Sequence, residues 1–399
     1  MDIQIGNFLK ILRMFFDDDK EISLVEPVDW NLLSDIARKQ NILPLFFEVA
    51  NSVEGYVSAS VYERDRLDTL VMVATQIQRS SVFSDIYEKI AQKGIYPIVV
   101  KGIICRQLYG ELGEHRPSSD EDILVEIKDF YQVKMVLEQE GYVCDIPNVT
   151  EKELNQIQEV SFYNPEENLM LEVHTNIIGI ENDEIAQMND FFKNVHEHGQ
   201  MIRIYGTEYK ILEPTEALLF LILHAYKHFK NRGVGIRQTM DILLYYKEYK
   251  EKISMEQLLR ALKICKAEMF WKDIIHIGNQ YFGVCEEYPE FICCPEELLK
   301  DMIYAGVFGK NGKTDYVAAR VNLGAQDGSN IMMKALFPSK QILVVGRPYL
   351  TEKPWLLPAV WVERWIKFLR YAGKDVWKIS HEIMEKSSVR MEIIKKYKK

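Results

Sequence analysis

The chain has 399 residues, 47% of them hydrophobic and 27% charged, so it can bury a sizeable core and form about two to four structural units. Its formal net charge of −10 argues against a broad nucleic-acid-binding surface, because phosphate contacts need clustered Lys and Arg. The longest apolar run, Ala217–Leu223, is too short to cross a membrane. No secretory signal opens the sequence and its cysteines lack C-x-x-C spacing, so we expect a soluble protein in the cytoplasm.

Residues 1–93 are predicted to form a helical N-terminal region. Apolar residues recur at helical spacing over residues 3–16. A second helix is expected to begin at Trp30 and to break near Asn41, before a third helix. A long helical segment over residues 61–93 completes the region.

Residues 94–212 have a different character, because short β-branched runs alternate with one stretch of helical spacing at residues 127–140. The predicted strands are residues 95–100, 123–127, 160–163, 169–175 and 201–205. The sequence therefore predicts an α+β fold, in which a small mixed β-sheet core is embedded between mostly α-helical N- and C-terminal regions.

The rest of the chain is predicted to be mainly helical. Residues 213–307 begin with a helix that has Pro214 near its first turn, and residues 308–399 comprise a loop and a C-terminal helical region. His224 and His228 are spaced i, i+4, which can bind zinc, but no third ligand is obvious. We therefore expect them to be core histidines or histidines that support a neighbouring site.

The stretch 96–125 favours phosphate chemistry. A buried strand ends at Lys101 and Gly102, and a helix is predicted to start at the glycine. The free backbone N–H groups at a helix start attract anions, and a glycine lets a phosphate approach the backbone without meeting a Cβ atom. This strand-glycine-helix pattern predicts a phosphate-receiving turn.

Asp120 and Asp122 stand two residues apart at the entry to the next apolar run, so on a strand they project from the same face. Like charges held so close are normally tolerated where a cation lies between them, although a solvated strand end is the alternative. Glu121 should face the other way. Glu172, in a later β-rich run, is the best third acid, and these hard oxygen ligands suit Mg²⁺ or Mn²⁺.

The order of a KG pair, R-x-x-x-D-x-D-[IL]-[LV]-V and a later E-V-H resembles the DNA polymerase β-type nucleotidyltransferase superfamily, specifically its bacterial "uncharacterised nucleotidyltransferase" branch. The resemblance implies that Gly102 is the family's first glycine, Asp120 and Asp122 its metal-binding pair and Glu172 its third acid. It also implies that the helical region 213–307 packs beside the nucleotide site. Glu121 stands where the family generally has an apolar residue, so we expect the rear face of this strand to be partly solvated.

The expected activity is metal-dependent transfer of a nucleoside monophosphate from an NTP to a hydroxyl acceptor. Asp120, Asp122 and Glu172 would hold the metal ions, and Glu172 would help to deprotonate the hydroxyl. Lys101 and Arg116 would neutralise the triphosphate. The acceptor stays open between a small molecule, a protein and tRNA. The alternatives are a catalytically inactive binding or antitoxin-like module with the same fold, and a metal-dependent phosphoester hydrolase.

Overall fold

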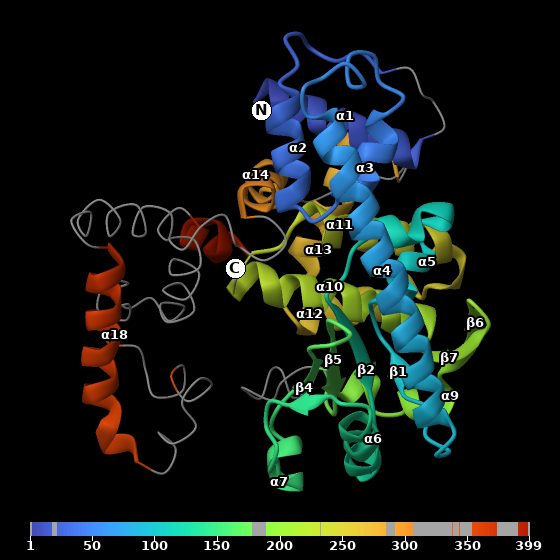
Figure 1. Ribbon diagram of the computed structural model, residues 1–399, viewed down its shortest axis with the longest axis vertical. Coiled ribbons are helices and arrows are strands. Elements are labelled where there is room, and N and C mark those ends of the chain that lie inside the picture. The colour runs from blue at the N-terminus through green and yellow to red at the C-terminus, as the bar shows by residue number, and fades with distance from the viewer. Residues whose placement is uncertain are drawn as a thin grey trace. The chain divides into compact units, whose positions relative to one another are not determined.

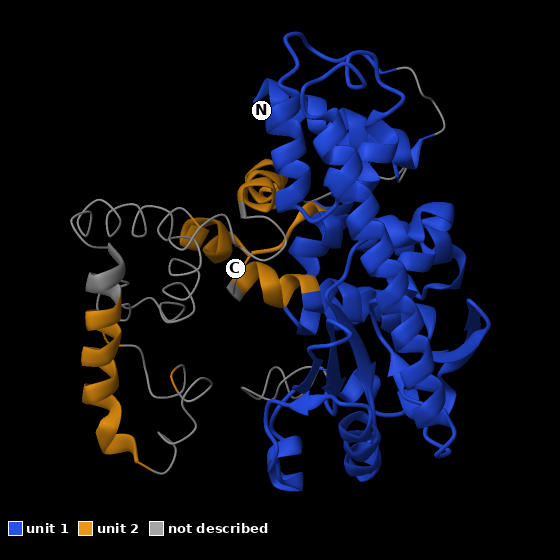
Figure 2. Cartoon of the chain, in the orientation of Figure 1, with its two compact units in different colours: residues 1–224, 237–292 blue, residues 225–236, 293–399 orange. Residues whose placement is uncertain are grey.

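The computed structural model describes residues 2–17, 22–177, 189–231, 233–284, 292–305, 337, 343, 353–372 and 390–397. The chain separates into two compact units, one of residues 1–224 and 237–292 and one of residues 225–236 and 293–399 (Figure 2). The loop predicted within residues 308–399 lies outside the described residues. The division into four regions stays a prediction.

The N-terminal helices of the first unit are α1 (Ile3–Phe16), α2 (Trp30–Lys39), α3 (Leu43–Ala50) and α4 (Tyr62–Ala91) (Figure 1). The Asp2 carboxylate caps α1 by accepting hydrogen bonds from the first free backbone N–H groups, and Asp29 caps α2 in the same way. Asn41 has a φ of +52° between α2 and α3, which confirms the predicted break.

The first unit contains a seven-stranded mixed sheet with the strand order β3-β4-β5-β2-β1-β7-β6. Strands β1 and β7 pair in parallel, as do β2 and β5, and the other neighbours are antiparallel. The α+β fold class predicted from the sequence is confirmed. The strands are β1 (Ile98–Val99), β2 (Asp120–Leu124), β3 (Val143–Cys144), β4 (Glu159–Asn164), β5 (Leu169–His174), β6 (Gln200–Ile204) and β7 (Thr207–Ile211).

Two of these strands were not predicted. Strand β3 has only two residues, too few for a periodic pattern. Strand β7 follows β6 through Tyr205 and Gly206, both at positive φ, which is the geometry of a tight two-residue hairpin turn. Its sequence mixes polar and apolar residues, so the turn and the pairing with β1 define it more clearly than its composition does.

The sheet has a helix-covered apolar face. Phe83 and Tyr87 of α4 and Phe130 of α6 (Ile127–Gln139) form one buried core with Ile123 of β2 and Val173 of β5. The remaining helices of this part of the chain follow in order. They are α5 (Ile103–Gln107), α7 (Glu151–Leu154), α9 (Val195–His198), α10 (Pro214–Asn231), α11 (Ile236–Tyr249), α12 (Met255–Ile264) and α13 (Glu268–Ile277).

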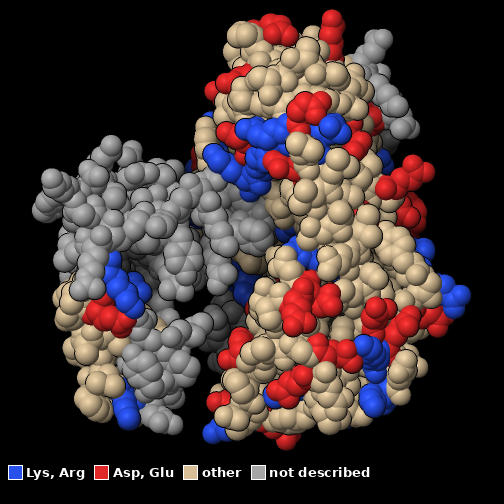
Figure 3. All heavy atoms as spheres, viewed as in Figure 1, with Lys and Arg blue, Asp and Glu red and all other residues tan. Residues whose placement is uncertain are grey.

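In the second unit, the described helices include α14 (Pro295–Ala305) and α18 (Leu357–Ala372). Arg390 forms an ion pair with Asp301 of α14 at 3.4 Å. None of the helices described here has the length and the apolar character that a bilayer crossing requires. On the face drawn in Figure 3, acidic side chains are spread widely, and the largest group of basic side chains lies near the N-terminal helices with acidic side chains beside it.

One polar cluster should hold the N-terminal helices together. Asp65 of α4 is fully buried and accepts hydrogen bonds from Ser34 (2.7 Å), Tyr56 (2.9 Å) and Arg38 (2.6 Å). Replacing Asp65 by Ala leaves these donors without their acceptor, so we expect a loss of about 3–5 kcal/mol in the free energy of unfolding. Asp68→Ala removes an exposed partner of the same arginine and should cost less than about 1 kcal/mol. Urea denaturation of both variants tests this, and equal losses would contradict it.

Candidate active site

The acids singled out in the sequence lie on two adjacent parallel strands. Asp122 of β2 is directly opposite Glu172 of β5. Because side chains alternate along a strand, Asp120, Asp122 and Glu172 point to the same side of the sheet. We call these three residues the acid cluster. The structure thus brings together side chains that are far apart in the sequence.

The ammonium group of Lys101 lies within the acid cluster. Its Nζ atom is 2.8 Å from Asp122 Oδ2 and 3.5 Å from Asp120 Oδ2. The lysine side chain is only 7% exposed. Burial disfavours the charged ammonium, but the attraction of Asp120, Asp122 and Glu172 outweighs it, and the pKa of Lys101 is raised above its ordinary value. Lys101 is therefore a buried cation shared by the cluster.

The three carboxylates differ in their electrostatic state. For Asp122 the effect of burial is outweighed by Lys101 and His174, which hold its pKa well below the ordinary value. Burial and the neighbouring charges of Asp122 and Glu159 raise the pKa of Glu172 to about 9. Asp122 is fully buried, whereas the side chains of Asp120 and Glu172 are 15% and 19% exposed. The cluster therefore meets solvent through Asp120 and Glu172.

His174 was not assigned a role from the sequence. It lies two residues after Glu172 on β5, so it faces the same side, and its Nε2 atom is 3.2 Å from Asp122 Oδ1. One ligand atom each from Asp122, Glu172 and His174 lies within 4.8 Å of the others. Two carboxylates and an imidazole are suitable donors for a divalent cation, with Asp120 as a further carboxylate. The i, i+2 spacing in E-V-H is the signal that could have identified this histidine.

Glu121 lies on the opposite face, as predicted, but the expected solvation of that face is wrong. Its side chain is 1% exposed and accepts hydrogen bonds from Arg106 (2.6 Å) and from the Ile103 backbone N–H (2.8 Å). The first amide of α5 is therefore bound to a carboxylate and is not free for a phosphate. Burial raises the pKa of Glu121, although Arg106 opposes the shift.

Glu121 also explains the glycine at position 102. A Cβ atom on Gly102 would lie 1.8 Å from Glu121 Oε2, and the residue has a φ of +67°. Both the close approach and the backbone conformation require a glycine. Gly102 therefore brings the turn after β1 against the rear of β2. Its predicted contact with phosphate stays a prediction.

Arg116 is buried away from solvent. Its guanidinium donates two hydrogen bonds of 2.6 Å to Asp241 of α11, which also accepts one from Tyr109. The side chain of Arg116 is 1% exposed. The pair with Asp241 compensates its charge and ties the segment before β2 to α11. A direct contact between Arg116 and a triphosphate stays a prediction. Asp241 is a second residue to which sequence reasoning gave no role.

Two further arginines contact the segments that lead into β2 and β5. Arg79 of α4 donates hydrogen bonds of 2.9 Å to the carbonyl oxygens of Ser118 and Asn168, and Arg237 donates one to that of Pro117.

The ring of His224 stacks on Phe220 of α10, and the charge of His224 contributes to lowering the pKa of Asp122. His224 thus lies beside the site.

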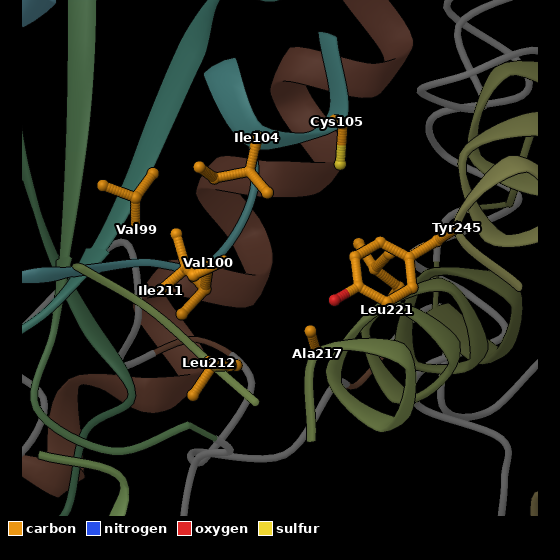
Figure 4. Close-up of a pocket in the computed structure, with 9 residues that line it drawn as sticks. All are labelled: Val99, Val100, Ile104, Cys105, Ile211, Leu212, Ala217, Leu221 and Tyr245. Carbon is orange, nitrogen blue, oxygen red and sulfur yellow. The ribbon is translucent and has the colours of Figure 1, made fainter. Parts of the chain in front are cut away.

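An apolar cavity lies beside the turn that carries Lys101. Its lining side chains project from the ends of β1 and β7 and from α5, α10 and α11 (Figure 4). They are Val99, Val100, Ile104, Cys105, Ile211, Leu212, Ala217, Leu221 and Tyr245. The cavity measures about 10 Å³, which is room for about one water molecule and not for a nucleobase. It is a packing feature of the wall behind the site.

The residues that carry the resemblance to nucleotidyltransferases therefore lie together on one mixed sheet, as an acid cluster on neighbouring strands beside a lysine-glycine turn. A family model described as "Uncharacterised nucleotidyltransferase" matches residues 26–283, which is more than half of the chain. The chain belongs to this nucleotidyltransferase family. Comparison with curated proteins and with solved structures finds no match. The matched range contains the whole sheet and every residue of the site described above.

The role of Glu121 can be tested at Gly102. Replacing Gly102 by Ala should lower the free energy of unfolding by at least about 3 kcal/mol, because the methyl group meets a carboxylate that Arg106 and Ile103 hold in place. Gly110→Ala is the matched control, since Gly110 has a φ of +58° with no atom within 4 Å of the added Cβ. It should lose only about 1–2 kcal/mol. Chemical denaturation measures both, and similar losses would show that the contact with Glu121 is unimportant.

Proposed function

We propose that this protein is a metal-dependent nucleotidyltransferase that transfers a nucleoside monophosphate from an NTP to a hydroxyl acceptor and releases pyrophosphate. The observation that carries the proposal is the acid cluster, in which Asp120 and Asp122 contact a buried ammonium, Glu172 faces the same side of the sheet, and Asp120 and Glu172 meet solvent. Membership of the nucleotidyltransferase family supports the same class of reaction.

In this proposal, Asp120 and Asp122 hold divalent ions and Glu172 completes the set. Bound Mg²⁺ or Mn²⁺ would supply Lewis-acid stabilisation of the charge that develops on the phosphate oxygens. His174 positions Asp122 through the 3.2 Å contact between Nε2 and Oδ1. The metal-binding carboxylates must be held in fixed positions, because a small displacement of the reacting groups lowers the reaction rate strongly.

Glu172 is the candidate general base for the acceptor hydroxyl. Burial and neighbouring carboxylates raise its pKa to about 9, so its carboxylate has a high affinity for a proton. A cation beside it favours the ionised form, which can then accept the hydroxyl proton. The partial exposure of the side chain leaves it accessible to an acceptor.

Lys101 is the candidate ligand of the triphosphate. Arg116 is a weaker candidate, because its charge is compensated by the bidentate pair with Asp241. Gly102 would serve the site by positioning Lys101 at the end of β1. The acceptor class stays open between a small molecule, a protein and tRNA, and a cytoplasmic location would supply both NTP and Mg²⁺.

The transfer reaction tests the proposal directly. Purified protein incubated with labelled NTPs, Mg²⁺ and a cell extract should label an acceptor, and Asp122→Asn should abolish the labelling because it removes a metal-ligand charge. Asp85→Asn, an exposed change on α4, is the matched control and should leave labelling unchanged. Circular dichroism should show both variants folded. Equal labelling by wild type and Asp122→Asn would refute the proposal, and absence of any labelling would favour the inactive binding module.

Nucleotide binding should depend on the metal. Without a divalent cation the acid cluster repels a triphosphate, so we expect calorimetric titration with ATP, CTP, GTP and UTP to show at least about tenfold tighter binding of the preferred nucleotide in Mg²⁺ than in EDTA. Equal affinities in Mg²⁺ and in EDTA for all four nucleotides would argue against a metal-dependent nucleotide site.

A further inference from the structure

The position of Lys101 has a consequence for how the cluster takes up metal. The ammonium contacts Asp122 Oδ2 and Asp120 Oδ2, which are the two oxygens of the cluster nearest to it. A divalent ion shared by the two aspartates would need oxygens of the same pair of carboxylates. Two cations at one position repel strongly, so the ammonium and the ion cannot both occupy the space between Asp120 and Asp122.

The metal-free cluster needs this ammonium. The ammonium contacts the carboxylates of Asp120 and Asp122, and the side chains of Asp122 and Lys101 are 0% and 7% exposed. Buried carboxylates without a compensating cation would be penalised by several kcal/mol each. Lys101 supplies the compensation when no divalent ion is bound.

A displaced ammonium needs a new anionic partner. Lys101 lies at the turn between β1 and α5, and its four-carbon stem can redirect the charge by rotation about single bonds. Behind it, the rear of the turn is closed by Glu121, which Arg106 and the Ile103 N–H already engage. The open direction is toward Asp120 and Glu172, where the cluster meets solvent and where a triphosphate would arrive.

We propose that Lys101 is a built-in competitor of the catalytic metal: its ammonium occupies the acid cluster in the metal-free protein and leaves it when a divalent ion and a triphosphate arrive together. This inference rests on the proposed function, because the triphosphate provides the displaced ammonium with its new partner. Metal alone then binds weakly, and metal and nucleotide strengthen each other's binding by the same factor.

The test is a Mn²⁺ titration without nucleotide, in which free Mn²⁺ is measured by electron paramagnetic resonance. Lys101→Met should bind Mn²⁺ at least about tenfold more tightly than wild type, because the competitor is gone. Lys89→Met is the matched control. It removes an exposed lysine that pairs with Glu140 on the surface, and its Mn²⁺ affinity should equal that of wild type. Unchanged or weaker binding by Lys101→Met would overturn the proposal.

A measurement on the wild-type protein covers the case in which Lys101→Met does not fold. Mn²⁺ alone should raise its melting temperature little, and Mn²⁺ with a non-hydrolysable NTP analogue should raise it by more than the sum of the separate effects. A large shift with Mn²⁺ alone, equal to the shift with both ligands, would overturn the competition.

The two proposals fail in different ways. Tighter Mn²⁺ binding by Lys101→Met, together with no effect of any NTP analogue on either protein, would refute nucleotidyl transfer and leave the competition for the cluster intact. Metal-dependent NTP binding and transfer by wild type, with no gain of Mn²⁺ affinity in Lys101→Met, would refute the competition and leave the transferase proposal standing.

Discussion

Strand β2 carries three consecutive carboxylates, whose negative charges must be compensated by cations or hydrogen-bond donors on both faces of the sheet. The site depends on which groups compensate them. Asp120 and Asp122 face Lys101 on one side, whereas Glu121 faces Arg106 and the Ile103 amide on the other. The turn after β1 therefore supplies partners to both faces of β2. Without these partners, ionised carboxylates at this depth would disfavour the folded state by several kcal/mol each.

This arrangement gives the lysine-glycine pair two separate tasks. Lys101 places a cation in the acid cluster, and Gly102 allows the backbone to approach Glu121 so closely that no other residue fits. A displacement of this turn would therefore move Lys101 relative to the acid cluster and would also disturb the contact between Gly102 and Glu121. The rear contact thus fixes the backbone position from which Lys101 enters the acid cluster.

The walls of the site are also held by ion pairs and packing. The bidentate pair between Arg116 and Asp241 joins the segment before β2 to α11, and Tyr109 donates a hydrogen bond to the same carboxylate. The cavity beside this wall is lined by apolar side chains and is too small for a nucleobase (Figure 4). This cavity therefore offers no room for a nucleotide.

Several elements were predictable because their signals are local. The helix over residues 3–16, the break near Asn41 and the long α4 follow from apolar spacing and turn chemistry. Strand β3 and the hairpin strand β7 were missed, because pairing with distant residues defines them more than composition does. The solvated rear face expected around Glu121 was wrong, because its partner Arg106 lies 15 residues earlier in a pattern that reads as an ordinary helix.

The sequence by itself determined that Asp120 and Asp122 face one side of their strand, since the period of two along a strand is a property of the backbone. It also determined the lysine-glycine turn, the flanking helices and the resemblance to nucleotidyltransferases. The register between β2 and β5, which places Glu172 opposite Asp122 on that side, was decided by the tertiary structure. Only the tertiary structure decided which charged side chains pair with each other. Lys101 enters the acid cluster, Glu121 binds Arg106, and Arg116 pairs with Asp241 at a distance of 125 residues along the chain. Ion pairing depends on burial and on contacts that folding creates between distant segments, and neither is encoded in local periodicity.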